Sequence, residues 1–111
     1  MSDEIKKYLD DIFKAIRLIE GYVGEEKKFE NFLSNKMMQQ AIERNLEIIG
    51  EATKKILQLQ PDIEVTAGRK IVNIRNLLIH AYDSVDSTRI WEIIIIHIPV
   101  LKTEVSLLLK S

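Results

Sequence analysis

Residues 36–59 decide the fold, and they read KMMQQAIERNLEIIGEATKKILQL. Apolar side chains recur along this stretch at three- and four-residue steps, the spacing that places them on one face of an α-helix. This face consists of six apolar residues and the polar Asn45, in the order Met38, Ile42, Asn45, Ile49, Ala52, Ile56 and Leu59. Ser34 or Asn35 can cap the first turn with a side-chain oxygen, and Pro61 prevents continuation beyond Gln60. We therefore expect one long amphipathic helix.

The segments on either side of this stretch show the same periodicity and are also predicted to be helices. They are residues 3–22 and 66–82. Between the first two helices, residues 24–34 are mainly polar, and we expect a loop anchored by Phe29, Phe32 and Leu33. Residues 83–86 are predicted to form a turn, after which Asp86 or Ser87 caps a last helix.

The last segment, residues 87–109, contains four consecutive isoleucines at 93–96, which by propensity favour a strand. No second strand-like run exists to pair with it, so we expect a helix that is kinked or broken near Pro99. Because this helix is apolar on most sides, we expect it to pack against a second copy of the chain. The prediction is an all-α fold, an antiparallel four-helix bundle forming a single domain over residues 1–111.

Composition excludes several classes of protein. The chain has 111 residues, no cysteine, two histidines and a formal net charge of -1. Disulfides, a thiolate nucleophile and a zinc knuckle are therefore excluded. No apolar run is long enough to cross a bilayer, and the acidic N-terminus lacks a signal-like apolar region, so we expect a cytoplasmic protein.

The chemistry is concentrated in residues 75–82, which read RNLLIHAY. Asn76 and His80 are four residues apart and share one helix face. Arg75 and His80 are five apart, about 140° around an ideal helix. The long arginine side chain, a loosened helix end or a partner subunit must therefore bring the two groups together.

These residue types suit cleavage of RNA. A histidine with a pKa of about 6.5 can accept the proton of a ribose 2′-hydroxyl or protonate the leaving 5′-oxygen. Arg75 offers fixed charge and several donors to phosphate oxygens, and Asn76 can hold the imidazole or contact phosphate. Neither step needs a metal or a cofactor. A polar cluster with a purely structural role is the alternative, because this spacing alone is a weak pattern.

Other polar positions allow two interpretations. One face of the 36–59 helix carries Arg44, Glu47 and Glu51. This face is either a solvated, salt-bridged surface or a stripe that supports His80. Trp91 and His97 lie among apolar residues, and we expect the first in the core and the second in the core or an interface.

At residues 75–82 the sequence resembles a HEPN domain, in particular the HepT-like branch of ribonuclease toxins. The family signature Arg-x4-His-x-Tyr, with a polar residue after the arginine, is matched by Arg75, Asn76, His80 and Tyr82. Residues 46–52, 69–72 and 91–99 resemble further stretches of the family, so the likeness covers nearly the whole chain. One departure is visible, because Ala67 and Gly68 stand where the family commonly has an aromatic residue before the basic pair.

The resemblance implies a helical bundle that dimerises with two motifs facing a shared cleft. It implies a metal-independent endoribonuclease in which Arg75 and His80 are catalytic and Asn76 supports them. It also implies a toxin–antitoxin pair, whose antitoxin is a minimal nucleotidyltransferase of the MNT type. Such an antitoxin transfers AMP to the motif tyrosine, here Tyr82, and adds bulk and negative charge beside Arg75.

Two further hypotheses remain beside the toxin. The chain could be a non-catalytic HEPN subunit that scaffolds a nucleotidyltransferase, or a helical dimer whose motif is only structural. Charge favours an RNA site, because no acidic residue lies between Glu64 and Asp83, whereas Arg69, Lys70 and Arg75 do. Two copies would focus about six positive charges on one groove, with Arg69 and Lys70 as RNA-binding residues.

Overall fold

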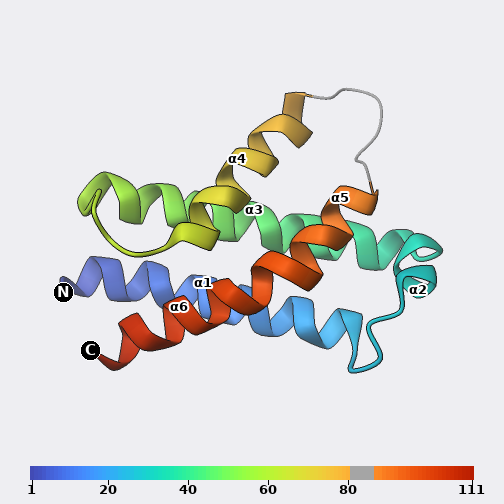
Figure 1. Ribbon diagram of the computed structural model, residues 1–111, viewed down its shortest axis with the longest axis horizontal. Helices are drawn as coiled ribbons and strands as arrows, with labels where there is room; N and C mark the ends of the chain where they lie inside the picture. Colours follow the sequence, from blue (N-terminus) through green and yellow to red (C-terminus); the bar gives the residue numbers. More distant parts are fainter. Residues whose placement is uncertain (81–86) are drawn as a thin grey trace.

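The computed structural model describes the backbone of residues 1–80 and 87–111, and the side chains of residues 1–73 and 87–111. All regular structure in these residues is helical, as Figure 1 shows, so the predicted all-α fold is confirmed. The elements in chain order are α1 (Asp3–Val23), α2 (Phe29–Leu33), α3 (Lys36–Leu59), α4 (Thr66–His80), α5 (Ser87–Glu92), a π-helical turn η1 (Ile93–His97) and α6 (Ile98–Lys110).

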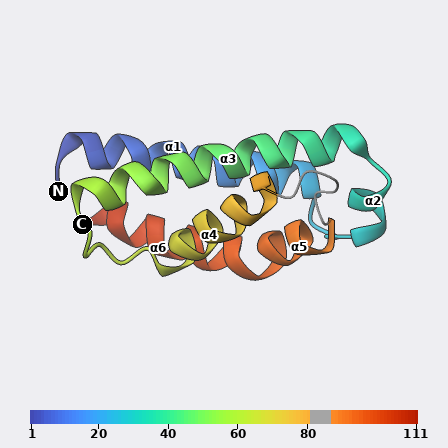
Figure 2. The same cartoon turned by 90° about the horizontal axis from the view of Figure 1, so that it is seen from above.

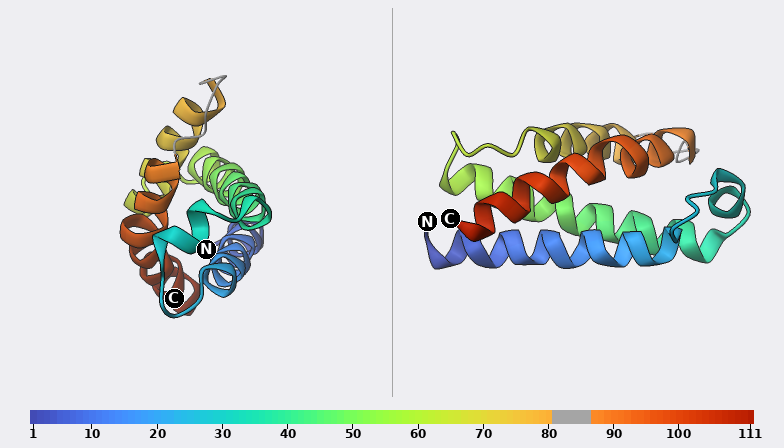
Figure 3. Two further views of the ribbon diagram at one scale, coloured as in Figure 1. Left: turned by 90° about the vertical axis from the view of Figure 1, so that its right-hand side faces the viewer. Right: turned by 60° about the horizontal axis from the view of Figure 1, so that its bottom comes forward.

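The two long helices α1 and α3 lie antiparallel and side by side, and α4, α5 and α6 lie together on one side of this pair (Figures 1 and 2). The continuous path of α5, η1 and α6 runs back along the bundle and packs on α1 and α4. The second half of α4 rises away from α1, which is clearest in the end-on view of Figure 3. The helix that carries the predicted motif thus projects from the bundle.

The core lies between the apolar faces of α1 and α3 and the inner sides of α4 and the last helix. The fully buried residues on these two faces are Leu9, Ile12, Ile16, Ile19, Ile42, Ile49 and Ile56. Asn45, the polar member of the predicted stripe, is also buried, and its side-chain amide donates to the carbonyl of Ala41 at 2.9 Å. The stripe ends earlier than predicted, because Leu59 is 48% exposed.

The predicted loop over residues 24–34 is partly wrong, because its second half forms the short helix α2. Phe32 is fully buried, and the ring centroids of Phe29 and Phe32 lie 5.6 and 5.5 Å from that of Trp91. This aromatic cluster joins α2 to α5 and holds the segment in place. Leu33, by contrast, is 54% exposed and anchors nothing. Asn35 then caps α3, its Oδ1 accepting from the backbone N–H of Met38 at 3.0 Å.

The last helix contains a π turn just before Pro99 instead of a simple break. The N–H of Ile98 bonds the carbonyl of Ile93, five residues earlier. Proline has no N–H, and its ring crowds the carbonyl four residues before it, so a wider turn lets the helix continue. His97 ends this turn and is half-buried.

One face of the last helix stays open in the single chain. Val100 is 51% exposed, and the other large exposed apolar residues of this helix are Ile95, Ile96 and Leu107. This is the surface at which the sequence pattern predicts contact with a second copy of the chain. Among the described residues, no helix is both long enough and apolar enough to cross a bilayer.

Candidate functional site

Three of the four predicted motif residues belong to α4. The backbone of Arg75, Asn76 and His80 belongs to the second half of this helix. Their side chains, and Tyr82 altogether, lie outside the described residues, as do the predicted continuation of the helix to residue 82 and the Asp86 cap. The described part of the site is therefore the first half of α4 and the contacts that hold it on the bundle.

The first turn of α4 is held from a distant part of the chain. The Glu104 carboxylate on α6 accepts from the backbone N–H of Thr66 through Oε2 and from that of Ala67 through Oε1, both at 3.0 Å. These are two of the N–H groups that a helix leaves without an intrahelical partner. A negative carboxylate at a helix N-terminus also interacts favourably with the helix dipole.

The same turn packs tightly on α3. A Cβ at Gly68 would lie 2.9 Å from Cγ2 and 3.2 Å from Oγ1 of Thr53, which is fully buried. Only a glycine lets the two helices approach this closely. This contact explains why position 68 has no side chain.

The two predicted RNA-binding cations follow the first three residues of α4. Both Arg69 and Lys70 are exposed. The Arg69 guanidinium donates to the carbonyl of Pro61, which closes the turn between α3 and α4. Arg69 therefore has a structural contact, and Lys70 lies beside it on the surface.

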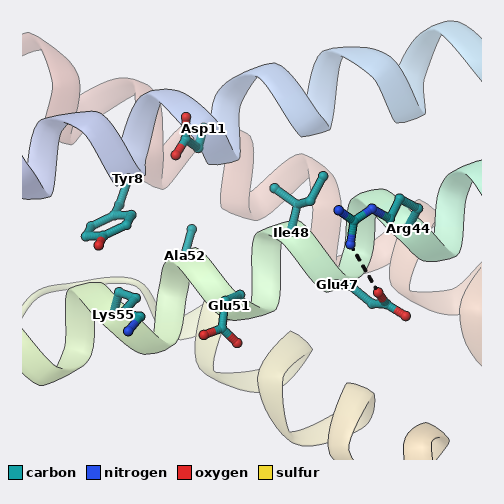
Figure 4. Close-up of a pocket in the computed structure, with 8 residues that line it drawn as sticks. All are labelled: Tyr8, Asp11, Arg44, Glu47, Ile48, Glu51, Ala52 and Lys55. Carbon is teal, nitrogen blue, oxygen red and sulfur yellow. Dashed lines mark ion pairs between the residues drawn. The ribbon is translucent and has the colours of Figure 1, made fainter.

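The predicted supporting residues lie on the exposed side of α3. Arg44 Nη1 lies 3.5 Å from Glu47 Oε2, and both side chains are open to solvent. Figure 4 shows Glu47 and Glu51 on the side of α3 nearer to α4 in that view, and Arg44 nearer to α1. The Arg44–Glu47 pair fits a salt-bridged surface, and the placement of Glu47 and Glu51 also suits support of the motif helix.

These side chains line a surface pocket of about 410 Å³. It is completed by Tyr8 and Asp11 from α1 and by Ile48, Ala52 and Lys55 from α3 (Figure 4). Sequence reasoning missed Tyr8, Asp11 and Lys55 as neighbours of the stripe. Only the antiparallel packing of α1 on α3 brings them together, although Lys55 lies one turn after Glu51.

One carboxyl beside this pocket is perturbed. Glu43 is half-buried, and burial raises its pKa above the ordinary value, to which the negative charge of Glu47 one turn away adds. Glu43 and Glu47 therefore repel each other along α3.

The fold and the motif helix together define the class of protein: a HEPN-like helical bundle with Arg75, Asn76 and His80 on a projecting helix. Comparison with known proteins agrees. The family model described as "Ribonuclease HepT-like" matches residues 12–108, which include all of α3 and α4. The chain belongs to the HepT-like ribonuclease family.

Individual relatives span most of the chain. A protein of Thermococcus cleftensis named "Probable ribonuclease HepT" is 45% identical over 101 residues, covering 87% of this chain and 88% of that protein. A Methanocaldococcus jannaschii protein with a provisional RNase designation is 32% identical over 109 residues, covering 97% and 84%. A second protein of that organism, whose name joins a gamma-glutamylcyclotransferase to a provisional RNase, is 34% identical, but the match spans only 47% of it. No solved structure matches the chain.

Proposed function

We propose that this protein is a metal-independent endoribonuclease, the toxin of a toxin–antitoxin pair, and that it acts as a dimer. The observation that carries the proposal is the family match over residues 12–108, because it includes the sequence motif Arg75, Asn76, His80 and Tyr82. Arg75 and His80 form the catalytic pair, and Asn76 supports them. The RNase names of the relatives support the same reaction.

In the proposed reaction, the ribose 2′-oxygen attacks the adjacent phosphorus and the bond from phosphorus to the 5′-oxygen breaks. His80 accepts the 2′-hydroxyl proton or donates a proton to the leaving 5′-oxygen. Arg75 stabilises the negative charge that develops on the phosphate oxygens. The products are a 2′,3′-cyclic phosphate and a free 5′-hydroxyl. Because one histidine fills one proton-transfer role, two motifs across a dimer complete the pair.

The surroundings of the motif support RNA as the substrate. The segment between Glu64 and Asp83 has cations but no acidic residue. Lys70 binds the RNA backbone near the start of α4. Arg69 binds it too, through the guanidinium N–H groups that do not donate to Pro61. Arg44, Glu47 and Glu51 form the polar stripe that orients the His80 end of the motif helix.

The dimer has a candidate surface in the open apolar face of the last helix. The exposed isoleucines of η1 and Val100 of α6 lie on this face. Covering it with the same face of a second copy removes apolar area from water and gives a two-fold symmetric contact.

We further propose that a nucleotidyltransferase antitoxin of the MNT type neutralises the protein by transferring AMP to Tyr82. The adenylyl phosphate would place negative charge two residues from His80 and block the RNA phosphate. Mass analysis of the protein after co-expression with such an antitoxin tests this step. Unmodified Tyr82 in the neutralised protein would rule it out.

Expression in a bacterial host tests the proposed activity. The wild-type chain should arrest growth and degrade RNA, whereas His80→Ala should do neither, and Glu92→Gln serves as an exposed control. Equal toxicity of the wild type and His80→Ala would reject the assigned chemistry. A chain that binds its nucleotidyltransferase tightly but never cleaves RNA would instead establish the scaffold alternative.

A further inference from the structure

We propose that Glu104 is a positioning residue for the motif helix. It acts by fixing the direction in which α4 leaves the bundle. The inference rests on the proposed ribonuclease activity of Arg75 and His80 on α4.

The start of α4 lacks a local cap. The residue at the N-cap position is Val65, whose carbonyl accepts from the N–H of Arg69 at 3.0 Å. Its side chain has no oxygen and is instead fully buried in the core. The free N–H groups of Thr66 and Ala67 are therefore bonded by Glu104, which lies far along the chain on α6. The first free N–H groups of α4 are therefore bonded by a residue of a different helix.

Both carboxylate oxygens take part, each with its own N–H. A two-point contact restricts rotation of the first turn as well as its distance from α6. The close approach of Gly68 to Thr53 supplies a third contact, from α3. These contacts come from two helices, and all lie within the first three residues of α4.

The motif lies at the opposite end of this helix. Fourteen residues separate Thr66 from His80, which is about 21 Å along an α-helix. A tilt of about 5° at the anchored end would therefore move the backbone of His80 by roughly 2 Å. Displacements of about 1 Å can reduce a catalytic rate a hundredfold, so a small loss of anchoring has a large effect on activity.

The chain offers a matched control on the same helix. The Glu20 carboxylate on α1 accepts from the Lys102 ammonium on α6, at 3.0 and 3.2 Å. Glu20→Ala therefore removes one carboxylate and one tie between α6 and another helix, as Glu104→Ala does, but it leaves α4 untouched. A purely structural role would predict similar effects of the two changes.

Kinetics on RNA form the first part of the test. We expect Glu104→Ala to lower kcat by about tenfold or more while KM changes less than about threefold, because the reacting groups and not the RNA-binding cations are displaced. Glu104→Gln should recover part of kcat, since its single amide oxygen can still accept from one N–H. Glu20→Ala should keep the wild-type kcat. Equal kcat for Glu104→Ala and the wild type, or equal losses for Glu104→Ala and Glu20→Ala, would overturn the inference.

A distance measurement separates this inference from the proposed function. The chain has no cysteine, so spin labels can be placed at Asn73→Cys on α4 and Lys36→Cys on α3, both exposed positions, in protein diluted with unlabelled chain. We expect the distance distribution to shift or broaden in Glu104→Ala and to stay unchanged in Glu20→Ala. An unchanged distribution in Glu104→Ala overturns the inference whether or not the protein cleaves RNA. An inactive wild type with a shifted distribution in Glu104→Ala rejects the proposed function and keeps Glu104 as the residue that orients α4.

Discussion

Replacing Gly68 by alanine tests how tightly α4 is seated on α3. In an unconstrained helix, Gly→Ala stabilises by about 0.5–1 kcal/mol, because glycine loses more backbone entropy on folding. At Gly68 the added methyl would lie 2.9 Å from the Cγ2 of Thr53, a buried side chain on a neighbouring helix. Because Thr53 is fully buried, its methyl cannot move aside without displacing other core side chains.

The expected magnitude follows from these opposing effects. Overpacking a well-filled core costs about 1–3 kcal/mol, which exceeds the gain in helix propensity. We expect Gly68→Ala to destabilise by about 1–2 kcal/mol, or roughly 4–8 °C in Tm for each kcal/mol. Urea unfolding followed by circular dichroism at fixed protein concentration measures this change.

A second substitution, at Thr53, tests whether the contact with Thr53 causes this loss of stability. Among the described residues, Thr53 Oγ1 has no hydrogen-bond partner, so Thr53→Ala removes an unsatisfied buried hydroxyl together with the clashing methyl. The double variant Gly68→Ala/Thr53→Ala should regain at least the wild-type stability, with a coupling of about 1 kcal/mol or more. A Gly68→Ala protein more stable than the wild type, or effects that simply add, would refute the tight contact.

Three further predictions concern other parts of the chain. Because the Glu43 pKa is raised in the folded state, the folded protein binds that proton more tightly, and its stability declines as pH rises past the ordinary carboxyl value of 4.5. Glu43→Gln should therefore be more stable than the wild type at pH 7 and lose this advantage near pH 4. A gain in stability that does not depend on pH would contradict the raised pKa. Phe32→Ala should cost about 3–5 kcal/mol in urea unfolding and change the emission of Trp91, which it contacts; unchanged emission would count against the aromatic cluster. Val100→Lys should weaken self-association in sedimentation equilibrium without lowering helix content, and an unaltered dimer would place the interface elsewhere.

The bundle could be predicted from periodicity because each of its main helices buries a face formed by apolar residues at three- and four-residue steps within one segment. Asn45 is an instructive case, since a polar residue inside the stripe is buried and bonded within its own helix. The short helix α2 was missed because it depends on an aromatic contact with Trp91, which is distant in sequence. Leu33 was wrongly expected to anchor the loop, because apolar character alone does not say which loop residue turns inward.

The site could be predicted only in its chemistry. The residues of the motif follow one another in sequence, so Arg75, Asn76 and His80 could be recognised together. The cap on α4 could not, because Glu104 belongs to a helix that only the tertiary fold brings to that point. The same applies to Tyr8, which reaches the α3 stripe from α1.

The proposed function requires that Arg75 and His80 cleave RNA without a metal. Cleavage of a single-stranded RNA by purified protein in excess EDTA, with analysis of the product ends, tests it most directly. We expect cleavage by the wild type to 2′,3′-cyclic phosphate ends, and a loss of at least about a hundredfold in both His80→Ala and Arg75→Ala. Cleavage that requires added Mg²⁺, or undiminished cleavage by His80→Ala, would contradict it.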